Sequence, residues 1–434
     1  MMDTTELELG FGRTTLRASV PTANLLGILA PQRQEGPVEE TQPGALVRDA
    51  LAHPIGTPRL RDLARPGQQV VIVTSDLTRP CPSERLLPPV LDELTAAGVP
   101  DAHIRIVVAL GLHRPMTASE LERAVGPAVY RRVQVMNHDP SDVVRLGITS
   151  AGTPVELFRP VVQADLRICL GNLELHYFAG FSGGAKAILP GCASEATISA
   201  NHAMMVRPEA STGRLVGNPV RADIEAGVAM LGVDFILNVV VDGQHRIVGA
   251  VAGEVVAAHR QGCEGVKRRS TVPIPRRADV VVVSAGGYPK DVNLYQAQKA
   301  LDNAAHAVRR GGTIILVAEC SEGYGNDTFE TWMKEAGSPD DLLARIQRQF
   351  MLGGHKAAAI ASVLKHAEVY LVSAMPAAAV RRCGMVPLDD LSQALAAAFD
   401  KAGPVASVAV LPQGGSVLPV VTGDDGADRS RTQA

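Results

Sequence analysis

The chain has 434 residues, which exceeds what a single hydrophobic core usually supports, so we expect about two domains. Hydrophobic residues make up 46% of the chain and charged residues 20%, as in ordinary soluble globular proteins. The formal net charge of −3 provides no broad basic surface, and the chain has only one Trp, six Tyr and eight Phe, so nucleic acid is not an expected partner.

The cysteines and the apolar runs of the sequence indicate the cellular compartment of the protein. The six cysteines are scattered without a Cys-x-x-Cys pair, which favours unpaired thiols in a reducing environment over disulfides or a zinc site. The N-terminal residues lack the apolar core of a signal peptide, and no apolar run approaches the roughly eighteen residues of a membrane span. These features predict a cytoplasmic protein that makes no membrane contact.

The first predicted elements alternate strand and helix. Residues 1–45 contain short strand-like pieces, with a surface loop predicted over 32–43. An apolar, β-branched run over 69–75 is typical of a strand buried on both faces, and a helix is predicted over 82–97. This alternation is the pattern of an α/β domain.

The same pattern continues along the chain. A strand is predicted over 103–110, and Thr117-Ala-Ser-Glu120 fits a capping box that opens a helix. A third strand is predicted over 164–170, and a later strand over 234–241 ends at Asp-Gly, which suggests a hairpin turn.

Polar residues follow three of these strands. Asp76 and Arg79 come after the first strand, His113 after the second and His176 after the third. Ligands of open α/β sheets bind at the carboxyl ends of the strands, so we expect these side chains at a binding edge. Taken alone, Asp76 and Arg79 could equally form a local salt bridge, and His113 could be a turn histidine bonded to the backbone.

The stretch from Gly171 to His202 concentrates glycines, two histidines and one lysine. Gly180 and Lys186 have the spacing of a phosphate-binding P-loop, G-x-x-x-x-G-K-[ST]. However, Ala185 replaces the second glycine and Ala187 replaces the hydroxyl that would hold magnesium, so this motif is excluded. A glycine-loop lysine could otherwise be a phosphate-binding or surface residue.

The complete spacing His176-x-x-x-Gly180-Phe-Ser-Gly-Gly-x-Lys186, then Leu-Pro-Gly and Asn201-His202, resembles the core signature of the nickel-pincer lactate racemase family. Members of that family use nickel held in a modified pyridinium mononucleotide, which is attached covalently to a lysine. The resemblance implies that Lys186 carries this nickel-pincer nucleotide, that His202 ligates the metal and that His176 is one of two acid/base histidines.

Two further segments resemble N-terminal motifs of the same family, Asp76-Leu-Thr-Arg79-Pro and Gly-Leu-His113-Arg-Pro-Met-Thr. They imply that His113 is the second acid/base histidine and that Arg79 binds the substrate carboxylate. Leu77 replaces the usual histidine of the first motif, and we expect this change to alter packing or substrate preference, because Asp76 and Arg79 are retained. The resemblance also implies cofactor contacts, from Asp76, Ser182, Gly183 and Gly184.

A second α/β domain is predicted after the basic, proline-containing segment 267–277. A Val-rich strand over 278–284 is followed by a helix over 293–308, which we expect Gly311-Gly312 to end before a strand over 313–319. This is a βαβ unit.

The start of that helix carries Tyr295, Gln296 and Lys299. Gln296 and Lys299 share a helix face, which alone would indicate a solvated surface. The pattern Tyr-Gln-x-x-Lys also resembles the substrate-contacting set of the family. The segment 352–357 resembles a family segment without an assigned role, and no G-x-G-x-x-G follows any strand.

The sequence therefore predicts two α/β domains with mostly parallel sheets and an active-site cleft between the domains. The expected boundaries are 1–272 for an N-terminal domain that binds cofactor and nickel and 278–403 for a domain that contacts substrate. Residues 404–434 would form a C-terminal segment that could pack back on the first domain and end in a disordered tail.

By resemblance the function is racemisation or epimerisation of a 2-hydroxy acid, and the enzymes that build the cofactor would be partners. Removing the C2 hydrogen as a proton is unfavourable because the adjacent carboxylate stabilises a carbanion poorly, whereas an electron-poor cofactor ring can accept a hydride. Histidines suit the hydroxyl proton, because their pKa lies near neutrality. The alternatives are a non-catalytic nickel-cofactor binding protein and a nicotinamide-dependent 2-hydroxyacid dehydrogenase.

Overall fold

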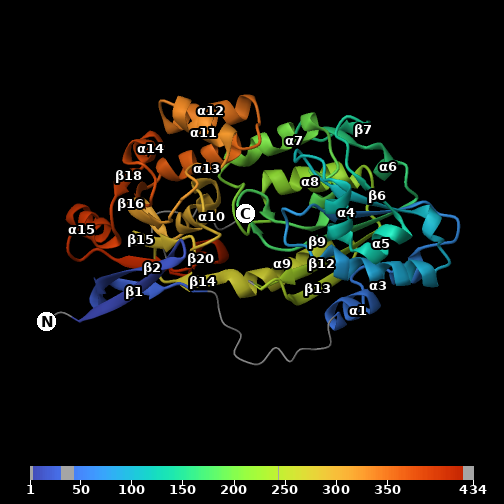
Figure 1. Cartoon of the computed structure of the whole chain (residues 1–434), viewed down its shortest axis with the longest axis horizontal. Helices are drawn as coiled ribbons and strands as arrows, with labels where there is room; N and C mark the ends of the chain where they lie inside the picture. The colour runs from blue at the N-terminus through green and yellow to red at the C-terminus, as the bar shows by residue number, and fades with distance from the viewer. Residues whose placement is uncertain (1–2, 31–43, 243, 424–434) are drawn as a thin grey trace. The chain divides into compact units, whose positions relative to one another are not determined.

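The computed structural model describes residues 3–30, 44–242 and 244–423. Their contacts divide the chain into two compact units (Figure 1). One unit combines the described residues up to 30 with those from Arg269 onward, and the other contains those from 44 to Arg268. The loop predicted over 32–43 and the tail predicted beyond residue 423 lie outside the described residues.

The unit that ends at Arg268 is built on a six-stranded sheet. In spatial order its strands are β13 (Ile247–Gly253), β12 (Phe235–Val241), β9 (Leu166–Asn172), β4 (Val70–Ser75), β5 (Ile104–Ala109) and β6 (Gln134–Asn137). All neighbours pair in parallel except β12 and β13, whose antiparallel pairing confirms the predicted hairpin. The central strands are mostly apolar and buried, as expected for a sheet that is covered on both faces.

Helices cover this sheet as the apolar patterns predict. One face packs against α1 (Ala45–Ala52), α3 (Ser83–Ala96) and α5 (Pro127–Arg132). Val108 and Leu110 pack with α4 (Ala118–Val125), whose predicted capping box is confirmed at Thr117. The remaining elements of this unit are α2 (Leu60–Leu63), β7 (Val143–Ile148), β8 (Pro154–Phe158), α6 (Arg159–Val162), β10 (Leu175–His176), β11 (Gly180–Phe181), α7 (Glu195–His202), α8 (Pro219–Ala229) and most of α9 (Ala257–Ser270).

The connection order creates a topological switch point. From β4 the chain adds β5 and β6 on one side, and it later adds β9 and β12 on the other side. Loops that leave β4 and β9 therefore diverge at the carboxyl edge, where open α/β sheets bind ligands.

The other unit contains an all-parallel sheet. Its strands lie in the order β18 (Val386–Leu388), β17 (Glu368–Val372), β16 (Val308–Val317), β15 (Ala278–Ser284), β19 (Val408–Leu411) and β3 (Leu25–Ile28). Its helices are α10 (Leu294–Ala304), α11 (Asp327–Glu335), α12 (Pro339–Arg348), α13 (Gly354–Leu364), α14 (Ala377–Arg382) and α15 (Leu391–Ala402). Two α/β units with mostly parallel sheets are thus confirmed.

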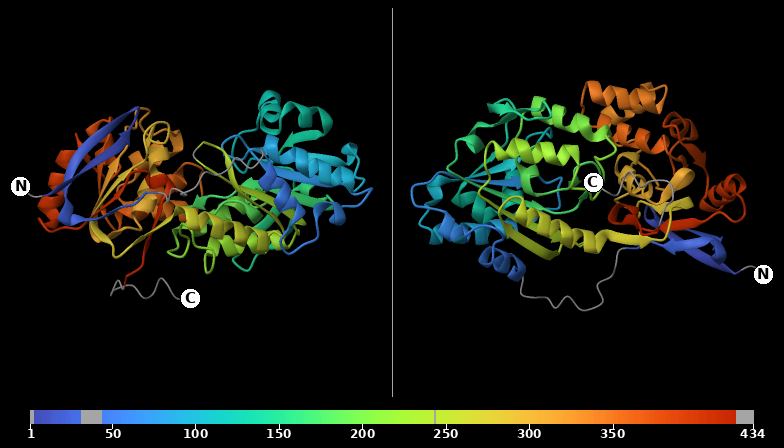
Figure 2. Two further views of the ribbon diagram at one scale, coloured as in Figure 1. Left: turned by 90° about the horizontal axis from the view of Figure 1, so that it is seen from below. Right: turned by 180° about the vertical axis from the view of Figure 1, so that it is seen from behind.

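The expected domain boundaries differ from the observed units at both ends of the chain. The ribbon of β1 (Thr4–Phe11) and β2 (Thr14–Pro21) packs Leu7, Leu9 and Val20 into the core of the C-terminal sheet (Figure 2). Residues 404–423 belong to the C-terminal unit, because β19 pairs with β15 and β3, and β20 (Leu418–Val421) pairs with β14 (Thr271–Ile274). Strand β3 and the start of β14 fall within the expected range 1–272, but both strands are part of the C-terminal unit. These pairings are non-local, so local sequence patterns do not reveal them.

The expected role of Gly311-Gly312 is also wrong. Helix α10 ends at Ala304, and both glycines lie inside β16. Val308 pairs with Ala278 and Thr313 with Val280, so residues 309–312 bulge opposite Asp279. A Cβ on Gly312 would lie 2.7 Å from the Asp279 carbonyl oxygen. The glycine allows the close backbone approach that this bulge needs.

No helix of the described ranges is long and apolar enough to span a membrane.

The bulge gives a stability prediction. Gly312→Ala should lower the free energy of unfolding by about 1–3 kcal/mol, the usual cost of overpacking, because its methyl group meets backbone that cannot rotate away. Gly415→Ala is the matched control, because a Cβ there meets nothing within 4 Å. Urea denaturation of both variants measures the difference, and equal stabilities would contradict the close approach.

Candidate active site

Three neighbouring strands bring the predicted residues of the first unit to one sheet edge. Asp76 and Arg79 follow β4, His113 follows β5, and β9 leads into the β10–β11 ribbon that holds His176. The strand ends are adjacent because β9, β4 and β5 are consecutive and parallel.

Asp76 and His113 form a hydrogen-bonded pair. The Asp76 Oδ2 lies 2.6 Å from His113 Nδ1, and Asp76 Oδ1 accepts a hydrogen bond from Thr78 Oγ1 at 2.7 Å. Burial alone raises the pKa of Asp76, but the hydrogen bonds from His113 and Thr78 outweigh it and hold the pKa below its usual value. Since an ionised carboxylate only accepts, His113 Nδ1 carries a proton and Nε2 the lone pair.

Arg79 is exposed and has no ion-pair partner among the residues that the structure describes. The alternative of a local salt bridge between Asp76 and Arg79 is not found, since Asp76 binds His113 and Thr78 instead. The positive charge of Arg79 contributes to lowering the pKa of both His176 and Lys186. A guanidinium in this position is well suited to an incoming carboxylate.

His176 and Lys186 form the second pair, with Nε2 and Nζ 3.2 Å apart. The Ala179 N–H donates to His176 Nδ1, so the neutral ring carries its proton on Nε2. Burial, then the charges of Arg221 and Arg79, hold the pKa of Lys186 well below its usual value. Burial and the neighbouring cations likewise lower the pKa of His176. These shifts favour the neutral form of both groups, and a neutral amine can accept a hydrogen bond from the imidazole N–H.

His202 ends α7 and is buried. Its Nδ1 lies 3.0 Å from the Oδ1 of Asn201. Phe178, which the sequence analysis did not single out, has its ring centroid 4.5 Å from that of His176, 4.9 Å from that of His202 and 5.4 Å from Lys186 Nζ. The aromatic ring thus gathers the two histidines and the lysine around one apolar surface.

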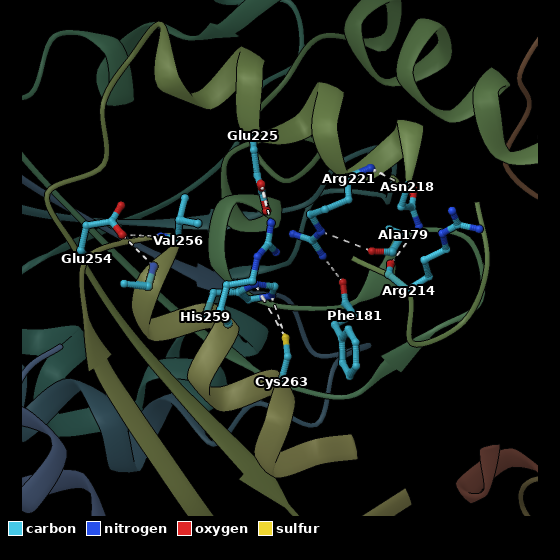
Figure 3. Close-up of polar contacts among 12 residues, drawn as sticks. Ala179, Phe181, Arg214, Asn218, Arg221, Glu225, Glu254, Val256, His259 and Cys263 are labelled. Atoms are coloured by element: carbon cyan, nitrogen blue, oxygen red, sulfur yellow. Dashed lines mark hydrogen bonds and ion pairs between the residues drawn. The ribbon is translucent and has the colours of Figure 1, made fainter. Parts of the chain in front are cut away.

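Buried polar side chains hold the loop between His176 and Lys186 in place (Figure 3). Arg221 of α8 is fully buried and donates to the carbonyls of Ala179 and Phe181. His259 of α9 lies 2.9 Å from the Ser182 carbonyl oxygen. Asn218, which caps α8, donates to the Phe178 carbonyl at 2.8 Å.

Arg221 and His259 were not predicted from the sequence. Arg221 precedes the buried Ile224 and Val228 by three and seven residues, so it shares the apolar face of α8. A charged residue at that spacing is the signal that could have found it. Burial lowers the pKa of Arg221 to about 10 and that of His259 to about 3.

The expected cofactor residues Ser182, Gly183 and Gly184 have structural contacts within the loop. The Ser182 hydroxyl donates to the Asn172 carbonyl at 2.8 Å and accepts from the Glu174 N–H at 2.9 Å. A Cβ on Gly183 would lie 2.6 Å from the Leu173 side chain, and a Cβ on Gly184 would lie 2.7 Å from the His259 ring. Side chains of the same unit therefore require these glycines.

The predicted substrate residues of the other unit lie on the first turns of α10. Asn293 caps this helix by accepting from the Gln296 N–H at 3.0 Å. Tyr295 is half-buried, with its ring 5.8 Å from that of Phe329, whereas Lys299 is exposed.

Metal binding would need donors from outside the chain. The described ranges contain no group of three or more His, Cys, Asp or Glu side chains that could hold a metal ion. His202 could serve as a protein ligand of such a metal through Nε2, because its Nδ1 faces Asn201. A neutral lysine amine fits covalent attachment, because the desolvated site disfavours a charge on Nζ. These donors are compatible with a metal that arrives within an organic cofactor.

Fold and site together define an α/β protein whose N-terminal sheet edge gathers two histidines, each with a hydrogen-bonded side-chain partner, and a half-buried lysine. The chain belongs to the lactate racemase family. The model of the lactate racemase N-terminal domain matches residues 11–213, and that of the lactate racemase C-terminal domain matches residues 274–419.

Two lactate racemases are similar over almost the whole chain. The lactate racemase of Thermoanaerobacterium thermosaccharolyticum is 36% identical over 95% of this chain and 98% of its own length, and that of Lactiplantibacillus plantarum is 34% identical over 95% and 99%. The structure of the Thermoanaerobacterium apoprotein matches with a TM-score of 0.86, covering 96% of this chain and 100% of that chain. A Thermotoga maritima protein with 20% identity and a TM-score of 0.62, covering 86% of this chain and 97% of that chain, shows the same fold.

His259 gives a pH-dependent prediction. Its pKa is about 3 in the folded protein against 6.5 normally, so below pH 6.5 the unfolded state binds the additional proton. The contribution of His259 to stability is complete above pH 6.5 and is lost as the pH falls toward 3. His259→Gln, which keeps a donor but does not titrate, should therefore lose less unfolding free energy than wild type between pH 6.5 and 4. Parallel slopes in urea denaturation would contradict this.

Proposed function

We propose that this protein is a racemase or epimerase of 2-hydroxy acids that works with a nickel-pincer nucleotide, and that lactate is the first substrate to test. The observation that carries the proposal is the pairing of a neutral lysine with His176 next to a second, carboxylate-oriented histidine at the same sheet edge. Membership of the lactate racemase family supports this interpretation.

The unit with Lys186 and His202 would hold the cofactor. Lys186 Nζ would carry the nucleotide covalently, and His202 Nε2 would ligate nickel, for which imidazole is a suitable donor. When bound, the cofactor supplies an electron-poor ring that can accept a hydride. Enzymes that build the nucleotide would have to be present when the protein is made.

The two histidines begin in complementary protonation states. His113 presents a lone pair on Nε2, because Asp76 fixes the proton on Nδ1, whereas His176 presents a proton on Nε2. His113 would therefore accept the hydroxyl proton of one enantiomer, and His176 would serve the other enantiomer, as the acid when its ring is doubly protonated and as the base when it is neutral. In the reverse direction the two roles exchange.

Substrate binding would depend on the remaining predicted residues. Arg79 would hold the carboxylate with a planar guanidinium. Tyr295, Gln296 and Lys299 of α10 would contact the hydroxyl and the rest of the substrate. A cofactor-binding protein without turnover would not need both His113 and His176, and a nicotinamide dehydrogenase would need the missing G-x-G-x-x-G fingerprint.

The proposal predicts racemisation without exchange of the C2 hydrogen. Protein produced together with the cofactor-building enzymes should interconvert L- and D-lactate in D₂O without incorporating deuterium at C2, because the histidines move only the hydroxyl proton. Chiral chromatography and mass spectrometry measure the two quantities. Deuterium incorporation at the rate of racemisation would refute the proton assignment, and inactivity toward lactate and longer 2-hydroxy acids would refute the proposed function.

A further inference from the structure

A chain of hydrogen bonds between buried side chains leads from the β7–β8 turn, through Asp223 of α8, to His202 at the end of α7. It starts at Thr149 and Thr153, which flank the turn between β7 and β8, and both hydroxyls donate to the carboxylate of Asp223 on α8. Asp223 Oδ2 accepts from Asn201 Nδ2 at 2.8 Å, and Asn201 Oδ1 lies 3.0 Å from His202 Nδ1.

Every member of this chain is shielded from water. Asn201 is 0% exposed, Asp223 3% and His202 7%. A buried carboxylate is costly unless donors surround it, and Asp223 has three, from Thr149, Thr153 and Asn201. The β7–β8 turn and α7 thus supply three donors to one carboxylate, and among these donors only Asn201 is an amide.

That amide has a single orientation. Its Nδ2 donates to the Asp223 carboxylate and to the Val220 carbonyl at 3.2 Å, and both groups can only accept. The carbonyl end of Asn201 must therefore face His202. Since Oδ1 can only accept, His202 Nδ1 must carry the ring proton, and the lone pair lies on Nε2.

We propose that Asp223 and Asn201 are positioning residues that lock His202 in the Nδ1–H tautomer, so that its Nε2 can ligate the metal. The inference rests on the proposed function for the claim that His202 ligates a metal, whereas the tautomer of His202 follows from the hydrogen bonds alone. Metal-bound histidines commonly donate their second N–H to a carbonyl or carboxylate, which fixes the ring. Here the Asn201 amide oxygen accepts that hydrogen bond, and the Asp223 carboxylate of α8 in turn fixes the amide.

A purely structural role predicts different behaviour. If the chain only linked α7, α8 and the β7–β8 turn, the polarity of the Asn201 amide toward His202 would not matter. If it sets the tautomer, then Asp223→Asn, which keeps the size but can donate to Asn201, should turn the amide and place N–H groups against His202. The ring proton would then move to Nε2, where it blocks ligation.

The variants separate these roles. Asp223→Asn removes the closer of the two hydrogen-bond acceptors that orient the amide, and Asn201→Leu removes the acceptor toward His202 itself. In the double variant Asp223→Asn, Asn201→Asp, the carboxylate at position 201 again accepts from His202. The amide at position 223 then donates to that carboxylate. Ser194→Ala is the matched control, because Ser194 caps the same helix without joining the chain.

Two measurements are made on each variant. Nitrogen-15 NMR of labelled histidines in the cofactor-free protein reports the tautomer of His202, assigned with His202→Ala. Nickel retained against a chelator, after production with the cofactor-building enzymes, reports the metal ligand. Nickel binding should weaken about ten- to a hundred-fold in both single variants, as for other outer partners of metal ligands. The combined variant and Ser194→Ala should behave like wild type.

Wild-type His202 in the Nε2–H tautomer, or a folded Asp223→Asn protein with unchanged tautomer and nickel retention, would overturn the inference. If Asp223→Asn does not fold, Asn201→Leu decides by the same criteria. His202→Ala distinguishes this outcome from failure of the proposed function: undiminished nickel in that variant would refute the metal assignment itself, whereas the tautomer measurement stands without any cofactor.

Discussion

Lys186 lies where an ammonium ion would be poorly stabilised, because burial and the charges of Arg221 and Arg79 all disfavour a proton on Nζ. Its neutral amine can then accept a hydrogen bond from the His176 ring at 3.2 Å. Buried side chains around the loop hold the two residues at this distance. Arg221 and His259 bind carbonyls of the loop that separates the two residues, so the loop cannot relax toward water.

The same constraint explains why the loop is rich in glycine. Gly183 and Gly184 have no room for a Cβ, because Leu173 and the ring of His259 occupy that space. Side chains of the same unit therefore pack against the loop, and the polar side chains of the loop fix its shape. The sheet edge also presents oriented bases and the exposed Arg79, which is a suitable arrangement for a small anionic substrate.

Local sequence patterns predicted the elements that depend on local chemistry. The buried strands carry β-branched runs, and the capping box at Thr117 forms as expected. Patterns failed where non-local pairing decides, as for β3, which joins a strand almost four hundred residues away, and for Gly312, which forms a bulge against β15. The site histidines could be predicted because each lies in a short motif, whereas Asp223 acts from another helix and has no fixed spacing to His202.

The central claim, that Lys186 is a neutral amine that carries the cofactor, is tested most directly by the mass of the denatured protein. Wild-type protein made with the cofactor-building enzymes should keep an added mass after denaturation, since a covalent bond survives unfolding. Lys186→Met, which has similar volume but no amine, should show the mass of the bare chain. The same added mass in Lys186→Met would contradict the account.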